Sequence, residues 1–174
     1  TYLLAFMVGD FAQVEQQHPS GTLVRVWTTK GKEEQGRFAL ENAVNLLTYF
    51  NDYFGIPYPL PKLDHLAIPD FAAGAMENWG AITYREVALL FDKDKSSPAT
   101  KQRITEIVAH EMAHIGNRDI LVMSVAVVLA GFIALATDVL LRGGFSVGDN
   151  NRGGAIQFAI VIAISLVASL FATL

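Results

Sequence analysis

The chain has 174 residues, with 13 Lys or Arg, 17 Asp or Glu and a formal net charge of −4 at pH 7. This mild acidity, without a basic patch, argues against nucleic acid as a partner. The absence of cysteine excludes disulfides, thiolate metal sites and a cysteine nucleophile.

The first third of the chain predicts strands followed by a helix. The apolar run Tyr2–Val8 and the alternating run Thr22–Thr29 are typical of strands, and the polar stretch Gln13–Gly21 between them predicts a loop. Over Glu33–Phe54, apolar residues recur at three- and four-residue steps, which predicts a helix with one apolar face. Gly55 can take the left-handed conformation that ends a helix.

More strands and a second helix follow this first helix. The segments Leu63–Ile68, Ala81–Tyr84 and Val87–Phe91 have the composition of strands. A helix is expected to begin after the cap residue Ser97 and to continue to Gly116. This succession of elements predicts an α+β fold.

The last third of the chain has a different composition. Ile120–Leu141 contains one charged residue and Gly154–Leu174 contains none, and each is long enough to cross the roughly 30 Å hydrocarbon core of a bilayer. Arg142–Gly153, between them, is polar and rich in glycine. We therefore expect a two-helix transmembrane hairpin, a membrane localisation and lipid as a partner. The alternative is a pair of buried helices in the core of a soluble domain.

The sequence HExxH occupies residues 110–114, on the second predicted helix. Four residues are slightly more than one helical turn, so His110 and His114 project from the same face and can bind one metal ion. Neutral imidazole suits Zn²⁺, and Glu111 is close enough to accept a proton from a zinc-activated water. Taken alone, the motif could also arise by chance.

A second motif, GAMENWG at residues 74–80, lies about thirty residues upstream of HExxH. Together with HExxH and the surrounding segments, it resembles the zinc aminopeptidases of the aminopeptidase N and puromycin-sensitive type. The resemblance extends over residues 24–114. It implies a partial thermolysin-like metallopeptidase domain that binds one Zn²⁺ ion and acts on peptides with a free N-terminus.

The resemblance also implies roles for the residues of the second motif. Glu77 would bind the free α-amino group of the substrate, so that the first peptide bond reaches the zinc. The alternative for Glu77 is a solvated loop carboxylate. Trp79 is expected to contribute to packing. His18 and His65 are expected to be structural or surface residues. The further substrate-binding residues that the resemblance implies are Gly74, Ala75, Met76 and Asn78.

The chain departs from the aminopeptidase pattern after the second histidine. The third zinc ligand of that family is a glutamate eighteen residues beyond the second histidine, and this position is Ile133. No glutamate follows Glu111, and the last tyrosine, Tyr84, precedes the position of the family's oxyanion-stabilising tyrosine. On a continuous helix Asp119 would point about 140° away from His114. We therefore expect a weakly held zinc ion and impaired turnover.

Residues 110–174 resemble a different family, the HtpX-like membrane zinc metalloproteases, in which a glutamate after the second apolar helix is the third ligand. The chain is accordingly expected to be a hybrid or truncated chain. The predicted domains are the end of an N-terminal β domain at 1–30, a partial catalytic domain at 31–118 and the hairpin at 119–174. An HtpX-like endopeptidase and a non-catalytic membrane-associated chain remain as alternative functions.

Overall fold

The computed structural model describes residues 6–142. Contacts divide the chain into two units, Thr1–Val122 and Met123–Leu174. The first unit contains the sheet and the helices that pack on it. Of the second unit, the described part is helical.

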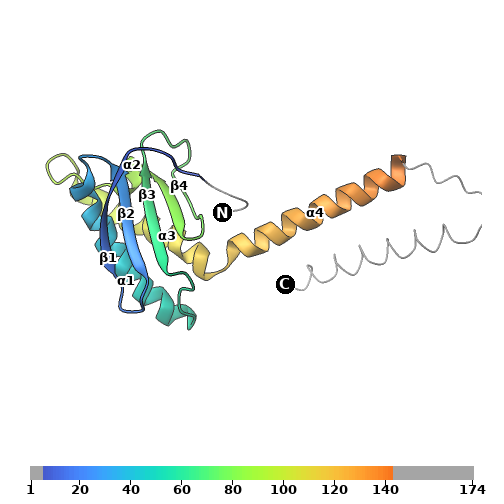
Figure 1. Ribbon diagram of the computed structural model, residues 1–174, viewed down its shortest axis with the longest axis horizontal. Coiled ribbons are helices and arrows are strands. Elements are labelled where there is room, and N and C mark those ends of the chain that lie inside the picture. The colour runs from blue at the N-terminus through green and yellow to red at the C-terminus, as the bar shows by residue number, and fades with distance from the viewer. Residues whose placement is uncertain (1–5, 143–174) are drawn as a thin grey trace, which may run out of the picture. The chain divides into compact units, whose positions relative to one another are not determined.

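Five strands form one mixed sheet in the order β1-β2-β3-β5-β4 (Figure 1). The central strands β2, β3 and β5 are parallel, whereas β1 and β4 pair antiparallel at the two edges. The strands are β1 (Phe11–Gln17), β2 (Leu23–Thr29), β3 (Lys62–Ile68), β4 (Ala75–Met76) and β5 (Ala81–Arg85).

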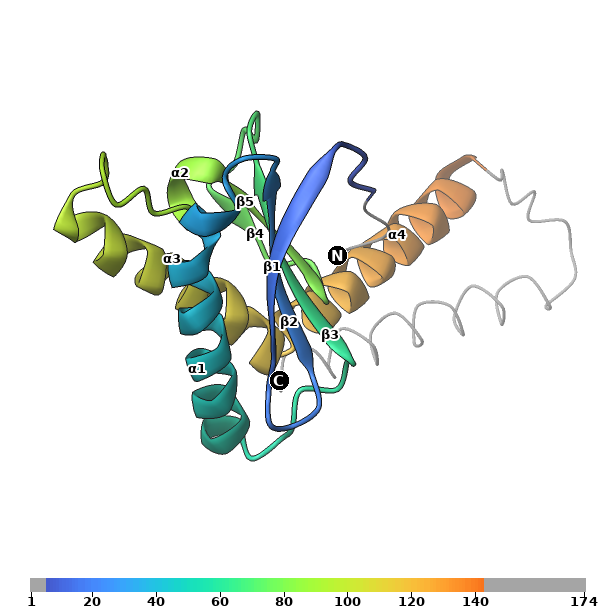
Figure 2. The same cartoon turned by 60° about the vertical axis from the view of Figure 1, so that its left-hand side comes forward.

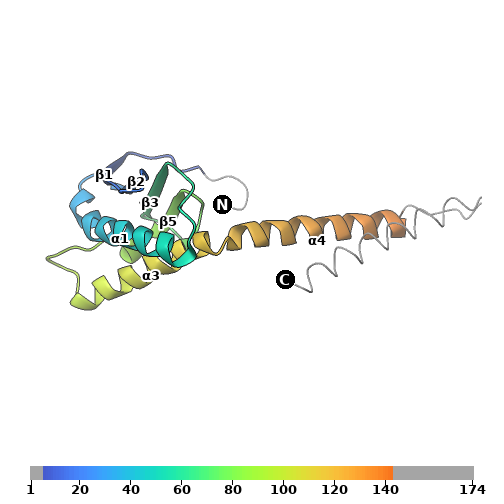
Figure 3. The same ribbon diagram turned by 90° about the horizontal axis from the view of Figure 1, so that it is seen from below.

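Two long helices cover one face of this sheet, as Figures 2 and 3 both show. The first follows a 3-10 turn and ends at Gly55, whose φ of 63° is the left-handed cap conformation expected from the sequence. The second has Pro98 in its first turn. The helical elements are the 3-10 turn Glu33–Gly36, α1 (Arg37–Phe54), α2 (Glu86–Leu89), α3 (Pro98–Gly116) and α4 (Asp119–Arg142).

The core lies between the sheet and the helices α1 and α3. Alternate residues of each central strand point into it, because side chains of a strand alternate between the two faces of the sheet. The helices contribute residues three and four positions apart, which confirms the apolar periodicity seen in the sequence. The buried apolar side chains include Val24, Val26, Leu63, Ile82, Tyr84, Leu40, Ala43, Leu47, Ile104, Val108, Met112 and Ile115.

The first strand is not where the sequence suggested. Residues 6–8 of the predicted strand Tyr2–Val8 have no regular structure, and residues 1–5 lie outside the described part. The strand β1 instead lies largely within the segment predicted as a loop. It pairs with β2 through backbone groups, while only Val14 among its side chains is fully buried, so the strand carries a weak hydrophobic pattern.

The predicted strand Val87–Phe91 is also wrong. Its first residues belong to the short helix α2, closed by a hydrogen bond from Leu90 N–H to the carbonyl of Glu86. Leu89 and Leu90 are consecutive and both buried, whereas Val87 is exposed. Such consecutive burial does not occur on a strand with one buried face, and the turn of helix makes it possible.

The prediction of a membrane localisation with two spans is wrong. Among residues 6–142 no single helix combines the length and the apolar composition needed to cross a bilayer. The broken pair Pro98–Gly116 and Leu121–Ala134 meets both requirements only when its two helices are taken together. The second predicted span, Gly154–Leu174, lies outside the described residues. The expectation of a lipid partner depended on these spans.

Candidate metal and peptide site

The helix α3 brings the two motif histidines together. His110 and His114 lie one turn apart, and their Nε2 atoms are 3.1 Å from each other. The two rings meet edge to face with centroids 4.6 Å apart. His110 is exposed and His114 partly so, and both therefore present a ring nitrogen at the surface of the helix. This confirms the one-face arrangement expected from the four-residue spacing.

A break after α3 gives His114 a carboxylate partner that the sequence did not predict. Arg118 has a φ of 58°, the left-handed conformation, and the chain turns there before α4 begins. The turn returns Asp119 towards the motif, and its Oδ2 lies 2.7 Å from Nδ1 of His114. On a continuous helix this carboxylate would point away, so the residue spacing concealed the contact.

The contact with Asp119 affects the pKa of His114. The hydrogen bond raises the pKa of His114, while burial opposes it. When the neutral ring donates its Nδ1 proton to the carboxylate, Nε2 keeps its lone pair, which faces Nε2 of His110 at 3.1 Å. A carboxylate on the far nitrogen is the usual support of a metal-binding histidine.

Glu111 lies on the inner side of the motif and is almost completely buried. Burial raises the pKa of its carboxyl group, and the charge of Glu77 acts in the same direction, whereas His110 and His114 oppose it. A carboxylate whose pKa is raised in this way is a better proton acceptor than a solvated one.

The second motif forms the edge of the sheet beside α3. The short strand β4 pairs with β5, with Ala75 opposite Tyr84, and it also contacts α3. Glu77 follows directly, and the contact between β4 and α3 brings this loop beside the HExxH helix. The charge of Glu77 raises the pKa of both Glu111 and His114. Gly80 closes the loop with a φ of 73°; a Cβ atom there would approach Leu60 to 2.9 Å.

The other predicted substrate residues occupy different positions in this loop. Gly74 is exposed and its carbonyl accepts a hydrogen bond from Arg85 N–H. Asn78 is buried and its side-chain amide donates to Thr83 Oγ1, so it supports the loop. Ala75 is partly exposed, whereas Met76 and Trp79 present exposed side chains.

Two residues of α3, His110 and His114, are placed to act as two ligands of one zinc ion. Two nitrogens bound to the same tetrahedral zinc lie about 3.3 Å apart, close to the distance observed between the two Nε2 atoms. Asp119 fixes the orientation of one ring. Within residues 6–142, however, no group of three His, Cys, Asp or Glu side chains is placed to hold a metal. Ile133, where the resemblance to the aminopeptidases implies a third ligand, is apolar.

A mixed sheet backed by an HExxH helix, with an acidic loop beside the histidines, defines the architecture of a metallopeptidase domain. Comparison with known proteins specifies the family: the peptidase family M1 domain matches residues 38–124, which is half of the chain. The chain therefore belongs to peptidase family M1.

Curated relatives agree with this assignment. Aminopeptidase M1-A of Oryza sativa subsp. japonica is 60% identical over 114 residues, covering 66% of this chain and 13% of the relative. Endoplasmic reticulum aminopeptidase 1 of Homo sapiens is 56% identical over 114 residues, covering 66% of this chain and 12% of the relative. The puromycin-sensitive aminopeptidase of Caenorhabditis elegans is 43% identical over 146 residues, covering 84% of this chain and 14% of the relative. The chain thus spans about an eighth of the length of these relatives.

Proposed function

We propose that this chain carries the zinc-binding and amine-binding part of an aminopeptidase site, which removes N-terminal residues from peptides. The observation that supports this most strongly is the approach of the two Nε2 atoms of His110 and His114 to 3.1 Å beside the Glu77 loop. The peptide class comes from the relatives, which are aminopeptidases.

Glu77 selects substrates with a free N-terminus. Its carboxylate pairs with the ammonium group of the substrate at one end of the site, in a charge-assisted hydrogen bond. This pairing fixes the register, so that the first peptide bond lies beside α3. Ala75 is the first residue of the edge strand β4, and Gly74 precedes it. Both offer backbone groups to an extended peptide. Met76 completes the proposed substrate-binding set through its exposed side chain, and Asn78 contributes by supporting the loop through its hydrogen bond to Thr83.

Glu111 acts as the general base. It accepts a proton from the attacking water as the new C–O bond forms, and it delivers that proton to the leaving nitrogen as the C–N bond breaks. The zinc ion that His110 and His114 would hold supplies a Lewis acid and lowers the pKa of water to about 7. Asp119 keeps the ring of His114 oriented through the 2.7 Å contact with Nδ1.

The proposed activity is impaired, because the chain provides only two protein ligands in its described part. Catalytic zinc sites have three protein ligands and an open position. With a third ligand missing at Ile133, zinc is held weakly and turnover is slow. The resemblance of residues 110–174 to HtpX-like metalloproteases remains a prediction, and an endopeptidase or a non-catalytic chain would each give a different result in the experiment below.

The test compares leucine p-nitroanilide with its N-acetylated form, in saturating zinc. We expect hydrolysis of the free-amine substrate alone, abolished by Glu111→Gln. Glu77→Gln should lower kcat/KM for that substrate by about 100-fold, since it removes a charge-assisted hydrogen bond to an ammonium group. Glu106→Gln, on an exposed position of the same helix, is the matched control and should have no effect.

Two results would overturn the proposal. Equal hydrolysis of acetylated and free substrates, unaffected by Glu77→Gln, would identify an endopeptidase. No zinc-dependent hydrolysis of either substrate, at any zinc concentration that keeps the protein folded, would identify a non-catalytic chain.

A further inference from the structure

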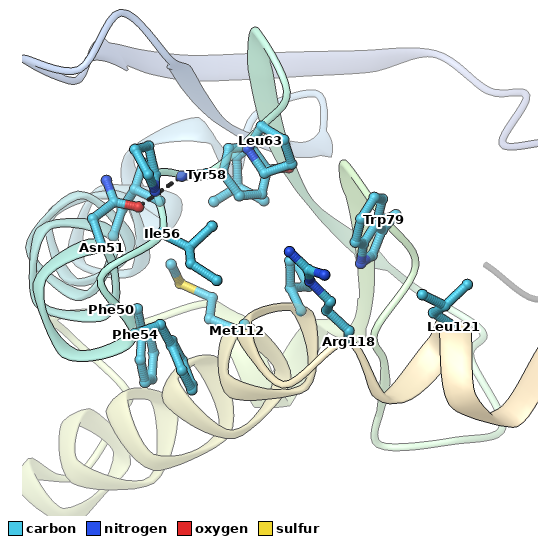
Figure 4. A pocket seen from close by; sticks show the side chains of 15 residues that line it. Phe50, Asn51, Phe54, Ile56, Tyr58, Leu63, Trp79, Met112, Arg118 and Leu121 are labelled. Atoms are coloured by element: carbon cyan, nitrogen blue, oxygen red, sulfur yellow. Dashed lines mark hydrogen bonds between the residues drawn. The ribbon is translucent and has the colours of Figure 1, made fainter. Parts of the chain in front are cut away.

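A cavity of about 300 Å³ lies between the C-terminal half of α1 and the end of α3 (Figure 4). Its walls are mainly apolar and include the rings of Phe50, Phe54 and Trp79 together with Met112 and Ile115. This volume is at the lower end of the range for small-molecule sites, which are typically apolar with a few polar groups. The motif histidines His110 and His114 do not line it, so the cavity is distinct from the proposed metal site.

Arg118 supplies a positive charge at this cavity. Figure 4 shows its side chain between Met112 and Trp79, pointing towards the space enclosed by the apolar walls. Within residues 6–142 its guanidinium has no carboxylate partner within ion-pair distance. Arg118 also occupies the left-handed cap position after α3, with a φ of 58°, where glycine is the favoured residue. A strained arginine here is unusual, and glycine would give the same turn at lower cost.

Two further polar side chains of the lining, Asn51 and Tyr58, are already engaged, and the Tyr58 hydroxyl donates a hydrogen bond of 3.1 Å to the carbonyl of Lys62. Asn51 Oδ1 accepts a hydrogen bond of 2.8 Å from the backbone N–H of Tyr58. A bound peptide would bring several backbone N–H and C=O groups into the cavity, and leaving such groups unpaired is costly. The lining therefore suits an apolar body with one anionic group better than it suits a peptide.

We propose that this cavity binds a small hydrophobic carboxylic acid, with its ring or alkyl chain among Phe50, Phe54 and Trp79 and its carboxylate on Arg118. The guanidinium presents several N–H donors in one plane, a geometry that matches a carboxylate. Charge complementarity identifies the ligand class, and the proposal does not depend on peptidase activity.

Isothermal titration calorimetry of the full chain with 4-phenylbutyrate and with the uncharged 4-phenyl-1-butanol tests the proposal. We expect the acid to bind at least about ten-fold more tightly than the alcohol, because it gains a charge-assisted contact. Arg118→Gly should reduce the affinity for the acid to that for the alcohol and leave the alcohol unchanged. This variant relieves the left-handed strain, so its fold is retained. Arg118→Lys should keep most of the preference for the acid.

A second pair of variants tests the location. Ile56 lines the cavity and is half exposed, so Ile56→Glu places a negative charge beside the ligand and should weaken binding of the acid about ten-fold. Val87→Glu introduces the same charge at an exposed apolar residue of α2 outside the cavity and should change nothing. A third ligand, N-acetylphenylalanine, resembles the C-terminal residue of a peptide. Its affinity shows whether the cavity prefers small hydrophobic acids or peptide C-termini.

Three results would overturn the proposal: no preference for the acid over the alcohol, an equal effect of Ile56→Glu and Val87→Glu, or tighter binding of N-acetylphenylalanine than of 4-phenylbutyrate. The last result would assign the cavity to peptide C-termini.

Discussion

His65 is a buried histidine whose hydrogen bonding is incomplete. Its Nδ1 lies 3.0 Å from the hydroxyl of Tyr84, and both side chains are fully buried. Within residues 6–142 its Nε2 has no hydrogen-bond partner. A buried polar atom without a partner destabilises a fold by roughly 1–3 kcal/mol. The sequence predicts a structural or surface residue at this position, and His65 is a structural one.

The first prediction is a double-mutant cycle on this pair. Tyr84→Phe alone should lower the free energy of unfolding by about 1–3 kcal/mol, because it leaves both ring nitrogens of His65 unpaired. Adding His65→Leu should recover at least that loss, since no buried polar atom of the pair then remains. Urea unfolding measures both changes. A double variant that is less stable than Tyr84→Phe alone would contradict this account.

The second prediction concerns acid stability. Burial lowers the pKa of His65 to about 4, although the charge of Asp64 acts against this shift, and the unfolded value is 6.5. The neutral ring is thus favoured in the folded chain, so its contribution is complete above pH 6.5 and is lost as the pH falls towards 4. The loss should be on the order of 3 kcal/mol.

Comparing the wild type with the His65→Leu/Tyr84→Phe variant isolates this contribution. His18 is also buried, and burial lowers its pKa, but it is present in both proteins and cancels. We expect the variant to lose less stability between pH 6.5 and 4 in urea unfolding measured at each pH. Parallel curves for the two proteins would show that His65 does not titrate in this range.

Individual residues of the site were predictable from sequence only where local geometry is regular. His110 and His114 belong to one continuous helix, so their spacing sufficed to place both rings on one face. Asp119 lies beyond an irregular turn at Arg118, and residue spacing gave the wrong direction for it. The proximity of Glu77 to the motif depends on sheet pairing, which the family resemblance implied and spacing could not provide.

At the scale of elements, the break between α3 and α4 supports the site. Residues before it present the histidines, and the first residue after it binds one of them. The carbonyl of Arg118 accepts the N–H groups of both Leu121 and Val122, so the turn and the start of α4 are connected through the backbone. The break therefore positions Asp119 as a support for His114.

The third prediction tests this support. Asp119→Asn should weaken zinc binding by about 10- to 100-fold, the usual effect of removing a carboxylate from the far nitrogen of a zinc-binding histidine. Competition with a zinc chelator measures the affinity. Asp94→Asn, at an exposed position of the loop before α3, is the matched control and should leave the zinc affinity unchanged. If both variants bind zinc like the wild type, Asp119 does not support the metal site.

Elements with strong periodicity were predicted well, and short or polar ones were not. The helices α1 and α3 each bury a regular apolar face and have recognisable ends, so pattern and cap residues agree. The edge strand β1 is mostly polar and is specified by its pairing with β2. The helix α2 is a single turn, too short for a 3.6-residue period to be visible.

At the scale of the whole molecule, the described residues 6–142 form one sheet with its covering helices. The chain spans about an eighth of the length of its relatives. This part includes both motifs that identify the family. They lie on α3 and at the edge of the sheet, which are neighbours in space. The residue pattern predicted the α+β class, and both motifs are present in the sequence itself. It could not predict membrane localisation from apolar composition, since apolar helices occur in several environments.

The central claim is that His110 and His114 together bind one zinc ion. Zinc titration by isothermal calorimetry, on the full chain freed of metal by a chelator, tests this most directly. We expect one site per chain in the wild type, with zinc that is removed by dialysis against a chelator, and no such site in either His110→Ala or His114→Ala. Zinc binding that persists in both single variants, or no zinc binding in the wild type, would contradict the account.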